Sequence, residues 1–257
     1  MQEELRARIQ RCAEWVAESR RLVVFTGAGI STDSGLPDFR GPEGVWTRRD
    51  KGLPPPVTEV RWSQVEPNAG HRAIRELQEM GKLDFLISQN VDNLHLKSGI
   101  RQDMIAELHG NMEQMKCVSC DRRFTKEEIG WEDSKWGEGS RSSPSRAGQP
   151  QCACGGRIIS SVVNFGDPMP ERDLGLAIAH AQECDLFLVV GSSLVVTPAA
   201  HMPFYALEAG ARLVIINQGE TPLDGKAHLR FWESIRDVLP PVVERVKAIL
   251  ASPKSSE

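Results

Sequence analysis

Residues 22–31 read LVVFTGAGIS, and this stretch decides the fold. Its first four residues, 22–25, are apolar and rich in β-branched and aromatic side chains, as in a short strand buried on both faces. The strand leads directly into a turn that contains Gly27 and Gly29. Glycine lets the backbone approach a phosphate closely, and backbone N–H groups stabilise its charge. The stretch is therefore typical of the entry to a nucleotide-binding α/β unit.

The glycine spacing argues against a hydride-transfer dehydrogenase. A third glycine at the Rossmann spacing would fall at position 32, which is Thr32. For a glycine turn considered alone, a tight turn that binds no ligand is the alternative interpretation.

Strand and helix patterns alternate along the rest of the chain. Further apolar runs predict buried strands at 85–87, 186–190 and 213–216. Apolar residues at helical spacing predict helices over about 5–19, 70–80, 172–182 and 203–209. This alternation predicts an α/β fold with a doubly wound, Rossmann-like parallel sheet. Polar or small residues follow each strand, so ligands are expected at the strands' C-terminal ends.

Two regions interrupt the α/β pattern. Residues 41–67 contain five prolines and two tryptophans, and we expect an ordered, irregular loop over the site. Residues 111–159 contain four of the six cysteines, which predicts a small metal-binding insertion. Within it, residues 130–150 are rich in Gly, Ser and Arg and are expected to form a mobile surface loop. The Rossmann-like domain would then consist of 1–110 and 160–257, with 41–80 as a cofactor-loop and helical part.

The composition is that of a globular protein. Of 257 residues, 40% are hydrophobic and 26% are charged, which excludes a mostly disordered chain, a fibre and a small disulfide scaffold. The net charge is −4 and no long basic block occurs, so nothing indicates general nucleic-acid binding. No apolar stretch is long enough to span a membrane, and the N-terminus lacks a secretory signal. We expect a cytoplasmic protein (nuclear if eukaryotic) whose cysteines are thiols or metal ligands.

The cysteine spacing predicts a structural zinc site. Cys117 and Cys120 form a C-x-x-C pair, and Cys152 and Cys154 form a C-x-C pair 31 residues further on. Four thiolates complete the tetrahedral shell of Zn²⁺ and leave no open position. Because the second pair is one residue tighter than usual, buried or idle thiols remain the alternative. Cys12 and Cys184 are predicted to be core residues.

His109 is the leading candidate for a general base, because it lies where the chain leaves the predicted sheet and histidine titrates near neutral pH. A hydrogen-bonded structural role is the alternative, and His95 has the same ambiguity. We expect the other four histidines to be structural or solvent-facing. Asp38, Asn90 and Asp92 follow glycine turns or strand ends, where they could contact a ligand or cap a helix.

Taken in order, these motifs resemble the sirtuin signature. They are GAGIS at 27–31, GLPDFRG at 35–41, SQNVDNLH at 88–95, ELHGN at 107–111, NFGD at 164–167, GSSL at 191–194 and IN at 216–217. GVW at 44–46 and SQN at 88–90 are most similar to the branch that includes the sixth and seventh human sirtuin types. Asn93 stands where a glycine is usual, and asparagine tolerates left-handed backbone angles.

The resemblance implies an NAD-dependent protein-lysine deacylase with NAD as a co-substrate and one structural Zn²⁺ bound by Cys117, Cys120, Cys152 and Cys154. NAD and its nicotinamide pocket would involve Gly27, Ala28, Gly29, Ile30, Asp38, Phe39 and Arg40. The ribose and nicotinamide would contact Gln89, Asn90 and Asp92, and the phosphate side Gly191, Ser192 and Ser193. The adenosine end would contact Asn217, Gln218 and Ile235. The acyl-lysine peptide would pair with a strand formed by Val163, Asn164, Phe165 and Gly166.

The family mechanism assigns catalysis to His109 and Asn90. Nicotinamide leaves, the acyl-lysine oxygen attacks the ribose carbon, and His109 removes a proton from the ribose hydroxyls. The products would be free lysine, nicotinamide and 2′-O-acyl-ADP-ribose. The alternatives are a protein mono-ADP-ribosyltransferase on the same NAD site and a non-catalytic NAD-sensing or zinc module, against which the presence of Asn90 and His109 argues. Acid-selective sirtuins carry a Tyr and Arg pair, whereas the only tyrosine here is Tyr205, so uncharged acyl groups are expected.

Overall fold

A computed structural model describes residues 2–57 and 62–252. The larger of its two sheets has the strand order β3-β2-β1-β7-β8-β9, and every neighbouring pair is parallel. Its strands are β1 (Leu22–Thr26), β2 (Leu83–Ser88), β3 (Ile105–Glu107), β7 (Leu186–Val190), β8 (Arg212–Ile216) and β9 (Leu229–Phe231). This is a doubly wound order: strands are added on one side of β1 as far as β3, and then on its other side from β7 to β9. The predicted Rossmann-like sheet is confirmed.

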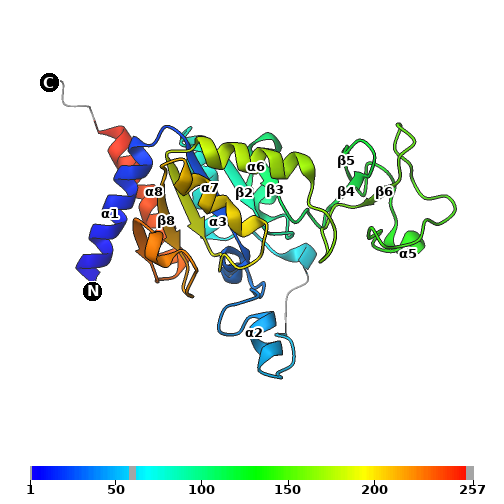
Figure 1. Cartoon of the computed structure of the whole chain (residues 1–257), viewed down its shortest axis with the longest axis horizontal. Helices are drawn as coiled ribbons and strands as arrows, with labels where there is room; N and C mark the ends of the chain where they lie inside the picture. The colour runs from blue at the N-terminus through cyan, green and yellow to red at the C-terminus, as the bar shows by residue number, and fades with distance from the viewer. Residues whose placement is uncertain (1, 58–61, 253–257) are drawn as a thin grey trace.

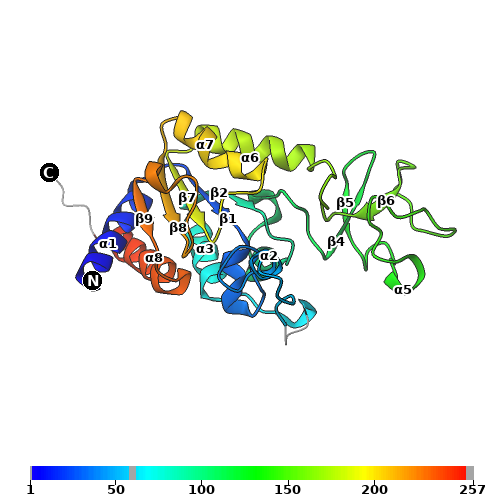
Figure 2. The same ribbon diagram turned by 60° about the horizontal axis from the view of Figure 1, so that its bottom comes forward.

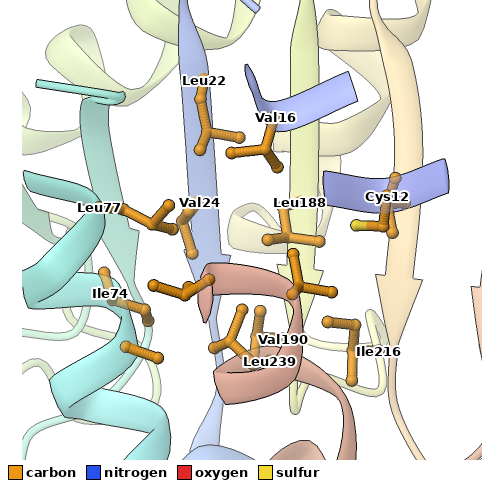
Figure 3. Close-up of a cluster of buried hydrophobic side chains, with 14 of the residues drawn as sticks. Cys12, Val16, Leu22, Val24, Ile74, Leu77, Leu188, Val190, Ile216 and Leu239 are labelled. Atoms are coloured by element: carbon orange, nitrogen blue, oxygen red, sulfur yellow. The ribbon is translucent and has the colours of Figure 1, made fainter. Parts of the chain in front are cut away.

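Helices cover both faces of this sheet (Figures 1 and 2). One face packs against α1 (Gln2–Glu18), α3 (Ala69–Glu79) and α8 (Ile235–Ala251). The other packs against α6 (Glu171–Glu183) and α7 (Met202–Glu208). Side chains alternate along β1, with Leu22 and Val24 in the first layer and Val23 and Phe25 in the second. Figure 3 shows the first layer, where residues of α1, α3 and α8 meet those of three central strands.

Helix α8 is not indicated by our sequence reading, because Pro240 and Pro241 lie inside it. Proline removes a helical hydrogen bond and normally ends or kinks a helix. Here the helix continues because one side is buried throughout, including Val242 and Val246, and packs against α1 and α3. The tertiary contacts therefore outweigh the local preference.

The smaller sheet is antiparallel, with the order β5-β4-β6, and lies at the end of the molecule far from both termini (Figure 1). Its strands are β4 (Gln114–Cys117), β5 (Arg123–Thr125) and β6 (Ile158–Ser160). They enclose a separate core that contains Met115, Trp131 and Ile158. The stretch expected to be a mobile loop, residues 130–150, contains helix α5 (Asp133–Trp136) and the buried Trp131, which anchors it.

The segment expected to be an irregular loop, residues 41–67, contains helix α2 (Val45–Asp50) and a short 3₁₀ turn, Trp62–Gln64. Residues 58–61 of that expectation lie outside the described residues. The remaining elements are α4 (Leu94–Ser98) and 3₁₀ turns at Ala28–Ser34, Gln102–Met104, Ala199–His201 and Asp224–Lys226. None of the helices within residues 2–57 and 62–252 combines the length and apolarity needed to cross a membrane.

Candidate active site

Two glycine turns pack backbone against backbone at the carboxyl edge of the sheet. Gly29 N donates to Gly191 O at 2.9 Å, so the turn after β1 contacts the turn after β7. A Cβ on Gly29 would lie 2.8 Å from Gly191 Cα, and one on Gly191 would lie 2.5 Å from Ile30 N. Gly191 also has a φ of 66°, which disfavours other residues. Gly27 and Ala28 lie in the first of these turns. We call the two packed turns the backbone cradle, and a side chain in place of Gly27, Gly29 or Gly191 would clash with the opposite turn.

Gln89 joins the end of β2 to both turns. Its Nε2 donates to Ser192 Oγ at 2.7 Å and to Thr26 O at 3.4 Å. Ser192 is buried and Ser193 is half-buried beside it. Three strand ends are therefore connected by one amide side chain, as expected for polar residues that follow neighbouring parallel strands.

Asn90, Ser31 and Asp92 form a buried polar cluster next to this connection. Ser31 Oγ donates to Asp92 Oδ2 at 2.6 Å, and Asn90 Nδ2 lies 3.3 Å from Ser31 Oγ. Burial raises the pKa of Asp92, against the lowering effect of hydrogen bonds from Ser31 and Leu94 N. Among the described residues, the buried Asn90 Oδ1 has no hydrogen-bond partner. An unpaired buried oxygen is costly, and a ligand hydroxyl or amide would satisfy it.

The hydrogen bond that His109 makes determines its tautomer. His109 Nδ1 lies 2.8 Å from Gln89 O, and a carbonyl oxygen can only accept. The hydrogen is therefore on Nδ1, and Nε2 carries the lone pair of a base. Burial lowers the pKa of His109 below 6.5, against the raising effect of this bond, so the imidazole is neutral at pH 7.

The cofactor-loop residues form an aromatic cluster with the expected peptide segment. Phe39 and Trp46 have ring centroids 5.0 Å apart, and Trp46 and Phe165 have centroids 5.7 Å apart. Arg40 lies over the Trp46 ring at 4.7 Å. Asp38 accepts from Gly41 N at 3.0 Å, and burial raises the pKa of its carboxyl. The loop that follows the GAGIS turn thus contacts, through Trp46, Phe165 of the expected peptide segment.

Residues 163–166 were expected to be a strand, and this expectation is wrong for the free chain. Strand β6 ends at Ser160, Val163 and Asn164 belong to no strand, and Phe165 and Gly166 lie in a turn. Gly166 has a φ of 88°, which ends an extended segment. Val163 N donates to His109 O at 2.9 Å, and one such bond does not make a ladder.

Asn217, Gln218 and Ile235 lie at the β8 and α8 side of the edge. Asn217 N donates to Phe231 O at 3.1 Å, and its Nδ2 donates to Gly219 O at 2.8 Å. Gln218 is exposed. Ile235 begins α8, and a Cβ on Gly70 would lie 3.2 Å from both Ile235 Cγ2 and Ile30 Cγ1. Ile235 therefore lies next to the first glycine turn, although it is distant in sequence.

The four cysteines of the small sheet converge and are positioned to bind a zinc ion. Their sulfur atoms lie within 4.8 Å of one another, with Cys117 Sγ 3.5 Å from Cys154 Sγ and Cys120 Sγ 3.6 Å from Cys152 Sγ. A tetrahedral site with Zn–S bonds of about 2.3 Å places the sulfurs about 3.8 Å apart. Ser119 N donates to Cys117 Sγ at 3.4 Å, as a thiolate requires. The tight C-x-C pair therefore fits the site.

A family profile described as "Sir2 family" matches residues 56–198, which is more than half of the chain. The chain belongs to the Sir2 family. NAD-dependent protein deacylase 2 of Archaeoglobus fulgidus is 39% identical, and the match covers 94% of this chain and 97% of the relative. NAD-dependent protein deacetylase 1 of Bradyrhizobium diazoefficiens is 37% identical over 93% of this chain and 97% of its own.

A plant relative is longer. NAD-dependent protein deacetylase SRT1 of Oryza sativa subsp. indica is 42% identical over 88% of this chain, and this Sir2 protein matches only 46% of its length. Solved Sir2 structures are also similar. Sir2Af2 bound to a myristoylated histone peptide has a TM-score of 0.67 at 35% identity, covering 96% of this chain and 99% of the other. Sir2 with a p53 peptide and NAD⁺ has a TM-score of 0.68 at 34% identity, with 91% and 97% coverage.

Our sequence reading missed a histidine pair in this Sir2 protein. The buried His71 and His95 have ring centroids 5.0 Å apart. His95 Nε2 bonds Thr26 Oγ1 at 2.8 Å, and Asn68 N donates to His71 Nδ1 at 3.3 Å. Residues 71 and 95 lie on different helices, and no local pattern connects them. His95 is thus a hydrogen-bonded structural residue beside the first glycine turn.

Proposed function

We propose that this Sir2 protein is an NAD-dependent protein-lysine deacylase. It would transfer the acyl group from lysine to ADP-ribose and release nicotinamide and 2′-O-acyl-ADP-ribose. The observation that carries the proposal is the base geometry: His109 is neutral, its hydrogen is held on Nδ1 by Gln89 O at 2.8 Å, and Nε2 is available to accept a proton. The relatives named deacetylase and deacylase support the same assignment.

The site residues would divide the work by their position on the sheet edge. The backbone cradle of Gly27, Ala28, Gly29 and Ile30 against Gly191 would lie against the phosphates, because its glycines let the two turns pack closely and present backbone to a ligand. Asn90 and Asp92 would orient the ribose, since Asn90 Oδ1 is the unpaired acceptor. Phe39 and Arg40 would cover the nicotinamide side. His109 would then take the ribose proton in the transition state.

The remaining assignments complete the proposal. Gln89, Ser192, Ser193, Asn217, Gln218 and Ile235 would line the ribose and adenosine side, and Asp38 would close the nicotinamide pocket. Residues 163–166 would become a strand only when a substrate peptide pairs with them, which adds the missing main-chain partner. Catalysis is assigned to His109 and Asn90.

Zinc would have a structural role. The four cysteines would hold one Zn²⁺, which supplies folding free energy to the small sheet when bound. We propose that residues 111–159 form this zinc-binding unit, and that 1–110 and 160–257 form the NAD-binding domain with 41–80 as its cofactor loop. We further propose a cytoplasmic location, supported by six cysteines that form no disulfide, and a place in the branch of the sixth and seventh human sirtuin types.

Incubation with NAD labelled in both the nicotinamide and adenosine parts, together with an acetylated peptide, tests the function. We expect stoichiometric free lysine peptide, nicotinamide and acyl-ADP-ribose. Label transferred to protein in place of the acyl product would indicate ADP-ribosyl transfer. Binding of NAD without turnover would contradict an enzymatic role.

A further inference from the structure

A second set of buried charges lies next to His109 and is not used in the proposed mechanism. Glu107 ends β3, two residues before His109, and its side chain is 3% exposed. It accepts from Asn111 Nδ2 at 2.6 Å and from Arg123 Nη1 at 3.2 Å. Arg123 comes from β5 of the cysteine-bearing sheet, so this contact joins the two sheets.

Asn111 extends the set in the opposite direction. Its side chain is fully buried, and Nδ2 donates both to Glu107 Oε1 and, at 2.9 Å, to Asn93 Oδ1. Asn93 has a φ of 64° and directly follows Asp92 of the polar cluster. The turn 107–111, which carries His109, is therefore connected to the Asp92 segment on one side and to β5 on the other.

The charges around Glu107 do not balance. Arg123 also binds Asp173 of α6, which is 5% exposed, so one guanidinium serves two buried carboxylates. The other charged groups that act on these carboxylates are Asp92, which disfavours ionised Glu107, and Asp121 and Lys116 on the Asp173 side. Burial raises the pKa of Glu107 to about 7, against the effects of Asn111 and Arg123, and it also raises the pKa of Asp173.

We propose that Glu107 is a positioning residue for His109, which in its ionised form fixes the 107–111 turn through Asn111 and connects that turn through Arg123 to the cysteine-bearing sheet. The proposal rests on the proposed role of His109 as a base. Ionised Glu107 accepts two hydrogen bonds, one of them from a cation, and such charge-assisted bonds are stronger than neutral ones. When Glu107 binds a proton, Arg123 pairs with Asp173 alone. The 107–111 turn then loses its connection to β5 and keeps only the one from Asn111 to Asn93.

The test is the pH profile of the Glu107→Gln variant. Wild type should lose kcat below an inflection near pH 7, where Glu107 protonates, and again below pH 6.5 as His109 protonates. Glu107→Gln is neutral at every pH, so the inflection near 7 should disappear while the lower one remains. Its kcat at pH 8 should fall by about ten- to hundredfold, as expected when a catalytic group is misplaced. KM for NAD should stay within about twofold, because ground-state contacts are unchanged.

Two further variants separate positioning from a general structural effect. Asp103→Asn removes the carboxylate of an exposed ion pair with Arg101, just before β3, and should leave the profile unchanged. Arg123→Gln removes the cation that stabilises ionised Glu107, so the upper inflection should move to higher pH. This upward shift differs from the loss of the inflection in Glu107→Gln, and it keeps the proposal testable if that variant does not fold.

A readout without turnover separates this proposal from the proposed function. In protein with ¹⁵N-labelled histidine and no NAD, the His109 ring signals should show two inflections in wild type and one in Glu107→Gln. If wild type consumes no NAD, the proposed function fails and the ring signals alone decide. Three results would overturn the positioning role. They are a single inflection in wild type, an upper inflection that stays at the wild-type pH in Arg123→Gln, and a change of the pH profile in Asp103→Asn as large as that in Glu107→Gln.

Discussion

The carbonyl oxygen of Gln89 determines which ring nitrogen of His109 carries the hydrogen, because an acceptor 2.8 Å from Nδ1 keeps the hydrogen there. The same residue's side-chain amide donates to Ser192 Oγ in the turn after β7, two strands away in the sheet. One residue thus orients the base and connects two halves of the nucleotide edge. The sequence identified Gln89 only as a ligand contact, since its backbone role depends on where β2 ends relative to the 107–111 turn.

Replacement of His109 by Ala should lower deacylation by about 10²–10⁴, or roughly 3–5 kcal/mol of barrier. NAD affinity should change little, because proton removal belongs to the transition state. The measurement is single-turnover acyl transfer at saturating NAD and peptide, with melting temperature as the folding control. His201→Ala, at an exposed histidine, is the matched control. Activity of His109→Ala within about tenfold of wild type would mean that His109 is not the base.

Buried histidine should make folding sensitive to acid. Burial lowers the pKa of His71 to about 4 from 6.5, so the folded protein binds fewer protons than the unfolded chain between these values. Stability from this group is complete above pH 6.5 and is lost as pH falls toward 4, by about 3 kcal/mol at 1.36 kcal/mol per unit. The contribution of buried Glu107 to stability changes with pH in the opposite direction, because its pKa is raised. The informative quantity is therefore the difference in unfolding free energy between a His71 variant and wild type at each pH.

Urea unfolding of His71→Gln and wild type at pH 7.5 and 5 measures that difference. The variant should lose less stability on acidification than wild type does. His201→Gln should retain the full wild-type dependence, because its imidazole is exposed. Identical pH slopes for all three proteins would contradict the assignment.

Among the elements, the long buried strands were predictable and the short ones were not. Leu186–Val190 is a continuous apolar run, because a strand covered on both faces needs apolar residues at every position. Strands β3 and β9 have three residues each, which is too short for a pattern. Helix α8 was missed because its prolines locally oppose a helix that tertiary packing stabilises.

The site follows the same division. Motif residues near strand ends, such as Asn90 and Asp92, could be identified from the sequence because both lie in the short segment that follows the apolar strand β2. The contact between Asn93 and Asn111 could not, since it joins different loops through side chains alone. The expected strand at 163–166 needs a partner backbone that the chain itself does not supply.

The contact between the two glycine turns should be sensitive to a single methyl group. Gly191→Ala places Cβ 2.5 Å from Ile30 N, whereas Gly210→Ala has a similar positive φ with nothing within 4 Å. Both variants should lose about 1 kcal/mol from backbone strain. Only Gly191→Ala should lose further stability and weaken NAD binding, because its turns must separate. Chemical denaturation and NAD titration measure both effects, and equal losses in the two variants would refute the close-contact argument.

Loss of the zinc site should act first on the small sheet. Freshly purified protein should contain about one Zn²⁺ per chain, and Cys152→Ser should contain much less, because three thiolates leave the tetrahedral shell open. Cys184→Ser, at a buried cysteine outside the cluster, should keep its zinc. Elemental analysis and melting temperature are the measurements. Full zinc content in Cys152→Ser would show that the C-x-C pair does not complete the site.

Considered as a whole, the molecule presents a partly exposed aromatic cluster beside the site, against which an uncharged acyl chain would pack. Phe39, Trp46 and Phe165 pack together beside the site, whereas the only tyrosine, Tyr205, lies on α7 and packs against the second core layer. Acetyl and longer uncharged acyl peptides should therefore be substrates. A succinyl carboxylate would lose its hydration there and would find Arg40 already paired with Asp50, at a cost of several kcal/mol. Comparison of kcat/KM should show at least about a hundredfold preference for acetyl over succinyl peptide, and equal efficiencies would contradict this prediction.

The hydrogen bond from Val163 N to His109 O joins two segments of the chain. One follows β3, where the chain leaves the large sheet, and the other follows β6, where the chain comes back from the small sheet. The chain between them forms the small sheet, which this backbone hydrogen bond and the side-chain contacts of Arg123 with Glu107 and Asp173 hold to the rest of the molecule. An insertion or deletion in the outer loops of the small sheet should therefore leave His109 in place, provided that both this hydrogen bond and the contact of Arg123 with Glu107 are kept.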